Sequence, residues 1–152
     1  MSATARLKEL GITLPDAPKP VANYVPAVRS GNLIFVSGQV SAAGGEAVKG
    51  KLGEGVSVED GQKAARLCAL AIMAQVDALV GSLDKVTRIV KLGGFVACSP
   101  DFDQHPAIIN GASDLMVDVF GDAGKHARFA VGVPSLPLGF AVEIDAVVEV
   151  AD

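Results

Sequence analysis

The chain has few of the residues that build metal centres or disulfide frameworks. Its 152 residues include two cysteines and two histidines, and their spacing matches no metal-ligand pattern. We therefore expect no metal site. Cys68 and Cys98 lie far apart in the sequence, and the first residues lack the apolar segment of a signal peptide. We expect a cytoplasmic protein in which both cysteines are reduced, buried thiols.

Long apolar runs and an excess of positive charge are also missing. Charged residues, glycine or proline interrupt every hydrophobic stretch, and none reaches the length of about 18 residues that suggests a membrane span. The formal net charge is −4, which argues against general nucleic-acid binding, because such proteins present a basic face. The glycine-rich segment 43–55 is not followed by the G-K-[ST] of a P-loop. The chain also lacks the G-x-S-x-G elbow of serine hydrolases.

Hydrophobic residues, in contrast, are abundant. They make up 50% of the chain, and the mean hydropathy of +0.42 is high for a soluble monomer. The length fits a single domain over residues 1–152, which buries roughly 70% of its unfolded surface. The surplus is typical of chains that bury apolar surface between subunits, because obligate interfaces resemble a core cut in half.

Hydrophobic periodicity and turn residues predict the order of elements. A short helix is expected over 3–10, before a linker over 13–20 in which three prolines prevent regular structure. The main elements expected after it are a hairpin over 24–40, a helix over 57–86, a strand over 86–99, a helix over 107–121 and two strands within 126–150. This order predicts an α+β domain with a mixed sheet and two main helices packed on one face. The strands are apolar on both sides, so the other face of the sheet must be covered too.

Two glycine-rich places leave alternatives open. Segment 43–55 is either a solvated loop or a lid over a site. Gly93 and Gly94, in the middle of the predicted strand 86–99, suggest a bulge or a close backbone approach.

Charged residues within the apolar segment 126–150 point to a site. Arg128 opens the first of its two strands and Glu143 lies in the second. A charge in apolar surroundings costs free energy unless it has a partner, and a guanidinium on a rigid strand suits a carboxylate ligand. The alternative is an interface salt bridge from Arg128 to Glu143 or Asp145. His126 points to the same face as Arg128 if the strand is already regular there; otherwise it only marks the strand entrance.

The chain resembles the RidA/YjgF family of reactive intermediate deaminases, also called endoribonuclease L-PSP. The resemblance rests on the run from Arg128 through Leu136-Pro137 to Val142-Glu143-Ile144, on Tyr24, on Val36-Ser37-Gly38-Gln39 and on Asn110. Many deaminases of the family have proline where this chain has His126, and often cysteine where it has Ala130. The loop 43–55 and an N-terminal extension over 1–20 are longer than in compact members. These departures indicate a divergent branch.

The resemblance implies a fold, an assembly and a chemistry. The fold would be chorismate-mutase-like, in a homotrimer whose sheets line a central barrel and whose clefts between subunits bind ligands. Family members hydrolyse 2-imino or 2-enamino acids to 2-keto acids and ammonia without a cofactor. By position, Arg128 would clamp the substrate carboxylate and Glu143 would hold the attacking water. Tyr24, from a neighbouring subunit, would line the pocket. Further contacts would come from Ser37, Gly38, Asn110 and His126.

Three functions follow from these residues. The first is a hydrolase of the 2-iminobutanoate/2-iminopropanoate deaminase type. The second is a non-catalytic protein that binds small carboxylate metabolites on the same trimeric scaffold, in which Glu143 would only orient Arg128. The third, an endoribonuclease, is disfavoured because phosphate contacts supply most nucleic-acid affinity and the chain has no basic stripe.

Overall fold

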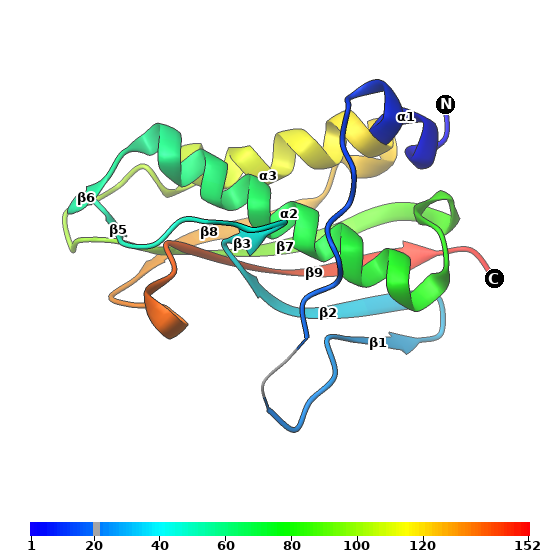
Figure 1. Ribbon diagram of the computed structural model, residues 1–152, viewed down its shortest axis with the longest axis horizontal. Helices are drawn as coiled ribbons and strands as arrows, with labels where there is room; N and C mark the ends of the chain where they lie inside the picture. The colour runs from blue at the N-terminus through cyan, green and yellow to red at the C-terminus, as the bar shows by residue number, and fades with distance from the viewer. Residues whose placement is uncertain (20–21) are drawn as a thin grey trace.

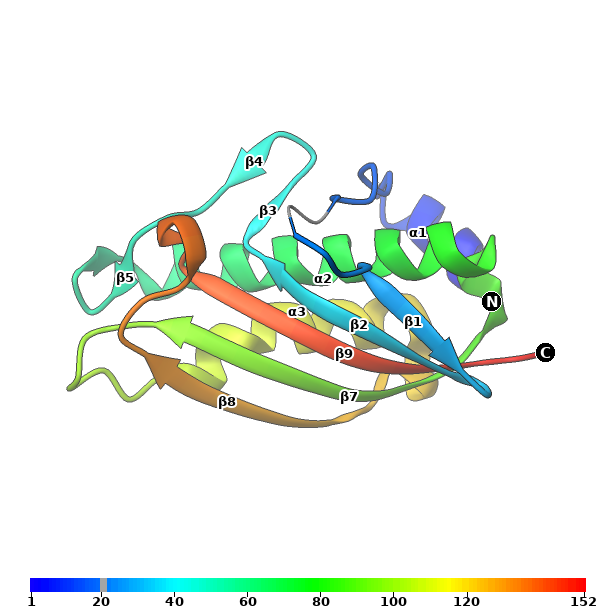
Figure 2. The same ribbon diagram turned by 90° about the horizontal axis from the view of Figure 1, so that it is seen from below.

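A five-stranded mixed sheet forms one layer of the molecule. The computed structural model describes residues 1–19 and 22–152. The strands lie in the order β1-β2-β9-β7-β8 (Figures 1 and 2). Their bounds are β1 Ala27–Ser30, β2 Leu33–Val40, β7 Val86–Ala97, β8 Ala127–Val133 and β9 Val142–Val150. Only β7 and β8 run parallel; the other neighbours are antiparallel. The predicted mixed sheet is confirmed, including the hairpin of β1 and β2.

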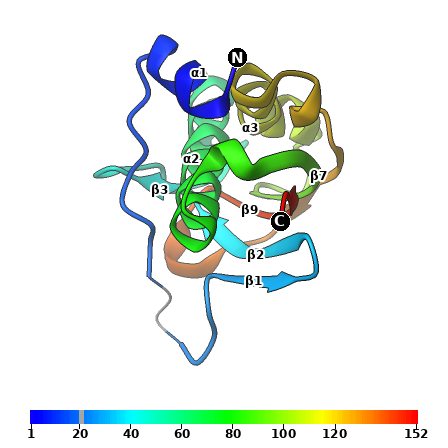
Figure 3. The same cartoon turned by 90° about the vertical axis from the view of Figure 1, so that its right-hand side faces the viewer.

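The second layer consists of helices on one face of this sheet. The long helices α2 (Val58–Val80) and α3 (His105–Phe120) lie side by side, and α1 (Ala3–Glu9) packs against α3 (Figure 3). The α+β prediction with two main helices on one face is confirmed. No helix in the described residues is long and apolar enough to cross a membrane.

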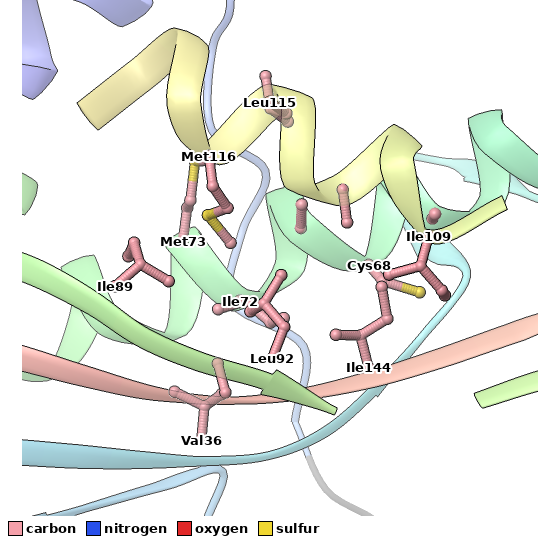
Figure 4. Close-up of a cluster of buried hydrophobic side chains, with 14 of the residues drawn as sticks. Val36, Cys68, Ile72, Met73, Ile89, Leu92, Ile109, Leu115, Met116 and Ile144 are labelled. Atoms are coloured by element: carbon pink, nitrogen blue, oxygen red, sulfur yellow. The ribbon is translucent and has the colours of Figure 1, made fainter. Parts of the chain in front are cut away.

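The hydrophobic core fills the space between the two layers. Side chains from both long helices meet those of the sheet there (Figure 4). Its fully buried members include Ile72, Met73, Leu92, Ile109, Leu115, Met116 and Ile144. On β9 the residues at even positions are buried, whereas those at odd positions are more exposed. The even positions therefore face the helices.

The ends of the long helices follow their capping residues. The Ser57 hydroxyl accepts a hydrogen bond from the Asp60 amide at 3.1 Å, as the predicted N-cap of α2 requires. The predicted end at residue 86 is wrong, because Gly81 has φ 91° and stops the helix. A 3₁₀ turn, η1 (Leu83–Lys85), follows it. Helix α3 begins two residues earlier than predicted, since Pro106 fits the first turn.

Segment 43–55 contains more structure than a solvated loop. Strand β3 (Ala42–Ala43) pairs with β4 (Glu46–Ala47), and β5 (Lys51–Leu52) pairs with β6 (Gly55–Val56). The side chain of Leu52 is fully buried. Most of the segment is nevertheless exposed, as in a solvated loop, and Leu52 is its one buried residue.

Of the two alternatives for Gly93 and Gly94, the structure shows a close approach and no bulge. Both pair regularly with β8 and β9, and the register of β7 shifts nearer its start, between Val86 and Lys91. A Cβ atom on Gly94 would lie 2.7 Å from the Ile109 side chain. These glycines instead let neighbouring side chains approach the strand.

The face of the sheet away from the helices stays uncovered in the single chain. We call it the open face. Its large exposed side chains are Val28, Phe35, Phe129 and Val131. The ring of Phe129 also meets Phe95 edge-on, with the ring centroids 5.3 Å apart. Large apolar side chains gathered on one exposed face are typical of an interaction site. None of the residues that the structure describes supplies the predicted cover of this face.

Candidate functional site

Four of the predicted site residues line one pocket of about 500 Å³, which we call the Glu143 pocket. They are Tyr24, Ser37, Gly38 and Glu143. Glu143 occupies an odd position of β9, so its side chain points away from the helices. The turn between β8 and β9, including η3 (Pro137–Gly139), forms another wall. Tyr24 and Glu143 of the same chain thus line one pocket.

A bulge in β2 shapes the floor of the Glu143 pocket. The register between β2 and β9 shifts between Val36 and Gln39. A Cβ atom on Gly38 would collide with the Glu143 carboxylate, so glycine leaves the space that the carboxylate occupies. The Ser37 hydroxyl donates to the Val25 carbonyl at 2.9 Å. Ser37 thereby fixes the segment that carries Tyr24.

Glu143 is a carboxylate with an increased proton affinity. Burial raises the pKa of its carboxyl above the ordinary value, and the neighbouring carboxylate of Asp145 raises it further. No ion pair within residues 1–19 and 22–152 includes Glu143. A half-buried carboxylate of this kind is suited to accept a proton from a bound water.

Two glutamines that the sequence reading left out of the site hold a wall of the Glu143 pocket. Gln75 donates through Nε2 to the carbonyl of Pro18 in the linker and, at 3.3 Å, to Gln39 Oε1. Gln39 in turn donates to the Ser37 carbonyl at 2.9 Å. Gln75 is only 3% exposed. An amide on the apolar side of α2 was the signal in the sequence, because a buried polar group requires partners.

Arg128 lies in a second group of polar residues, which we call the Arg128 cluster. It pairs with Leu92, whose side chain is fully buried under the helices, so Arg128 faces α3. Its guanidinium donates from Nη1 to Ser113 Oγ at 3.0 Å and from Nη2 to the Pro106 carbonyl at 3.3 Å. His126 also reaches Ser113, with Nε2 2.8 Å from Oγ. His126 and Arg128 therefore do share a face.

When His126 is neutral, the donor and the acceptor of each hydrogen bond in the Arg128 cluster are determined. His126 Nδ1 lies 2.6 Å from the Gly124 carbonyl, which can only accept, so Nδ1 carries the proton. Nε2 then accepts the Ser113 hydroxyl proton, and the oxygen of that hydroxyl accepts from Arg128. The sequence reading missed Ser113. The sequence did contain an indication: Ser113 follows Asn110 by three residues, so both side chains lie on the same side of α3.

The Glu143 pocket and the Arg128 cluster are separate in one chain. Strand β7 lies between β9 and β8, and the two side chains point to opposite faces of the sheet. The described chain has no ion pair from Arg128 to Glu143 or Asp145. A single ligand can touch both groups only if they come from different copies.

Comparison with known proteins assigns the chain to a family. Residues 4–149 match the family model described as "YjgF/chorismate_mutase-like, putative endoribonuclease". The chain belongs to the YjgF family. It is 50% identical over 147 residues to protein TCP17 of Trypanosoma cruzi, covering 95% of this chain and 92% of that protein.

Two further relatives of the YjgF family show the range of similarity. The crystal structure of Atu1372 from Agrobacterium tumefaciens, a protein of unknown function, has a TM-score of 0.90 and 52% identity; the match covers 98% of this chain and 92% of that one. The 2-iminobutanoate/2-iminopropanoate deaminase of Dermatophagoides farinae is 31% identical over 139 residues, which are 90% of this chain and 93% of that protein. The predicted RidA/YjgF resemblance and its fold are confirmed.

Cys68, Cys98 and His105 make no hydrogen bond to Arg128 or Glu143. No set of three or more His, Cys, Asp or Glu residues in the described part of this YjgF-family chain could hold a metal ion. Cys68 and Cys98 are free and buried, as predicted. His105 begins α3 and contacts Cys98 rather than Arg128.

Proposed function

We propose that this YjgF-family protein hydrolyses small 2-imino or 2-enamino acids to 2-keto acids and ammonia, at a site shared between subunits. The proposal rests on one observation: two groups with complementary roles lie at different places in the chain. A cation suited to a carboxylate stands in the Arg128 cluster, and a carboxylate suited to a water stands in the Glu143 pocket. Within residues 1–19 and 22–152 neither group meets its counterpart, and the open face lies beside the pocket.

A homotrimer would bring the two groups together. The open face exposes Phe35 by 47%, Val131 by 43% and Phe129 by 36%. Obligate subunit interfaces are apolar in this way. Glu143 and Val131 both pair with Phe95 across the sheet, so they lie in one row of the open face. A subunit that covers Val131 would therefore also approach the Glu143 pocket.

Arg128 is prepared for a carboxylate by its own chain. Of the five N–H groups of a guanidinium, one is committed to Ser113 and one to Pro106. These bonds hold the plane of the guanidinium, and the remaining N–H groups can grip a carboxylate with two parallel bonds. The carboxylate fixes the position of the imine carbon, which removes much of the entropic cost of reaction.

Glu143 would supply the proton transfers. It takes a proton from the attacking water as the oxygen bonds to the imine carbon and the C=N electron pair moves to nitrogen, which forms a carbinolamine. Protonated Glu143 then returns the proton to nitrogen. Finally, Glu143 passes the proton of the carbinolamine hydroxyl to the nitrogen as the C–N bond breaks, which gives the 2-keto acid and ammonia. The raised pKa of Glu143 favours both steps near neutral pH.

The test uses an amino-acid oxidase to generate 2-imino acids in the presence of the purified protein, with imine trapped by semicarbazide. We expect faster loss of the imine, abolished in Arg128→Ala and Glu143→Gln. Arg66→Ala, an exposed arginine on α2, is the matched control and should behave like the wild type. A folded wild-type protein that accelerates no imine in a panel of amino-acid-derived substrates would rule the proposal out.

The second candidate function is binding of a small carboxylate without turnover. It is favoured by the Arg128 cluster, whose hydrogen bonds fix the guanidinium without help from Glu143. Calorimetry with 2-oxobutyrate separates the cases. Binding that is lost in Arg128→Ala, in a protein that hydrolyses no imine, supports the binder. Analytical ultracentrifugation supplies the assembly, and a monomer at micromolar concentration would contradict a shared site in either case.

A further inference from the structure

A second cleft, distinct from the Glu143 pocket and the Arg128 cluster, contains a cysteine and a histidine. It has a volume of about 520 Å³ and lies where the ends of β7 and β8 meet the start of α3. We call it the Cys98 cleft. The side chains that matter here are those of Lys51, Cys98, Phe102 and His105. Neither Arg128 nor Glu143 lines it.

Cys98 and His105 are in direct contact in this cleft. The Cys98 sulfur lies 3.4 Å from His105 Nε2, within hydrogen-bond distance for sulfur. Phe102 packs edge-on against the imidazole, with the ring centroids 5.3 Å apart and the planes at 81°. Cys98 remains 9% exposed. The thiol is therefore held against a base and still reaches the cleft.

The contact depends on a glycine in the neighbouring strand. A Cβ atom on Gly132 would lie 2.5 Å from His105 Nε2 and 2.7 Å from the Cys98 sulfur. Real Cβ atoms do not approach so closely, so any other residue would push the two groups apart. The bare backbone at 132 leaves the thiol and the imidazole together.

Cys98 needs His105 as a base, because its thiol is protonated at neutral pH. Burial raises the pKa of the Cys98 thiol, so the sulfur carries its proton at neutral pH. A protonated thiol is a poor nucleophile unless a base removes the proton, and His105 Nε2 is the base in contact with it. The thiolate formed in this way is strongly nucleophilic, because nucleophilicity rises with thiol pKa.

The backbone around Cys98 indicates which electrophile fits. The Cys98 amide donates to the Val133 carbonyl at 3.1 Å and the Ser99 amide to the Leu52 carbonyl at 3.0 Å. Neither amide can then stabilise the oxyanion of an acyl-transfer intermediate. Disulfide exchange lacks a resolving thiol, since Cys68 is fully buried in the core. An electrophile whose negative charge develops away from the attacked carbon suits the cleft better.

We propose that Cys98 and His105 form a nucleophilic pair that adds to small α,β-unsaturated carbonyl compounds. The sulfur bonds to the β-carbon while its proton passes to His105 Nε2. The C=C electron pair moves to form an enolate, and the imidazolium returns the proton to the α-carbon. The sum is thiol plus alkene giving thioether, with no oxidant or leaving group. Lys51, which also lines the cleft, supplies a cation for the enolate oxygen.

The test measures alkylation of the folded full-length protein by acrylamide at neutral pH, with peptide mapping by mass spectrometry. Cys68 is the internal control, because it is fully buried and should react only after denaturation. We expect Cys98 to be alkylated in the native protein, and about a hundredfold more slowly in His105→Asn, the lower end of what a positioned base contributes.

A second variant separates loss of the base from loss of the fold. Gly132→Ala leaves His105 in the chain but pushes it away from Cys98, so it should show the same reduction while keeping the circular dichroism of the wild type. Equal rates in the wild type and His105→Asn would overturn the proposal. So would native alkylation of Cys98 no faster than that of Cys68. Neither result bears on imine hydrolysis, because the cleft contains neither Arg128 nor Glu143.

Discussion

Removing the hydroxyl of Ser113 tests whether the Arg128 cluster orients a ligand clamp. Ser113 accepts from Arg128 at 3.0 Å and contacts His126 at 2.8 Å. Ser113→Ala breaks both contacts and leaves the guanidinium with its bond to the Pro106 carbonyl. The arginine then samples several rotamers, and a carboxylate must pay the entropy of ordering it.

The expected loss can be worked out from these bonds. A hydrogen bond to a charged group contributes about 1.5–3 kcal/mol, and partial exposure of Arg128 together with the remaining bond to Pro106 lowers this to about 1–2 kcal/mol. Since 1.4 kcal/mol is a factor of ten, Ser113→Ala should weaken 2-oxobutyrate binding by roughly 5- to 30-fold. The stability of the fold should change little, because the cluster lies at the edge of the sheet.

Isothermal titration calorimetry with 2-oxobutyrate gives the result directly. Ser113→Thr keeps the hydroxyl and should retain affinity close to the wild type. Ser30→Ala, an exposed serine on β1, is the matched control. An affinity of Ser113→Ala within twofold of the wild type would refute the orienting role, and so would an equal loss in Ser113→Thr.

Three further outcomes follow from the described contacts. Burial raises the pKa of Glu143, so its carboxylate binds a proton more tightly in the folded than in the unfolded protein. The free energy of unfolding therefore decreases as the pH rises through the pKa that Glu143 has in the folded protein. Glu143→Gln should therefore raise the urea midpoint at pH 7, with the difference vanishing in acid; a lower midpoint at pH 7 would contradict this. Gly38→Ala should displace the Glu143 carboxylate, slow imine hydrolysis and cost about 1–3 kcal/mol by overpacking, which a urea titration would detect; unchanged activity would show that the carboxylate has room to move. Phe129→Glu, on the open face, should yield monomers in ultracentrifugation, whereas Leu79→Glu, on exposed α2 surface, should leave the assembly unchanged; an intact assembly in Phe129→Glu would exclude Phe129 from the interface.

The sequence predicted the elements better than it predicted their neighbours. Periodicity located the long helices and the strands because apolar spacing differs between them. The end of α2 was missed since apolar residues continue past Gly81, where the backbone turns left-handed. For Gly93 and Gly94 the sequence left a bulge and a close approach as alternatives, because it cannot show that Ile109 needs the space beside the strand.

How the predicted site residues are grouped in space could be learned only from the structure. Arg128 and Glu143 belong to strands that follow each other in the sequence, yet β7 lies between those strands. The pairing register places the two side chains on opposite faces of the sheet. That arrangement depends on pairing between distant segments, which local periodicity does not encode. Ser113 and Gln75 were missed because a hydroxyl or an amide within a helix has no pattern of its own until its partners are known.

The bond from Gln75 to the Pro18 carbonyl makes the Glu143 pocket depend on the start of the chain. Pro18 and Lys19 belong to the linker and line the pocket, while α1 is held at its own end by the bond from the Thr4 amide to Asp84. The N-terminal segment is thus held at two places, at α1 and at the pocket wall. A truncation or a fusion at the N-terminus would loosen the contact at the pocket wall and change ligand affinity, although no residue that a ligand contacts is altered.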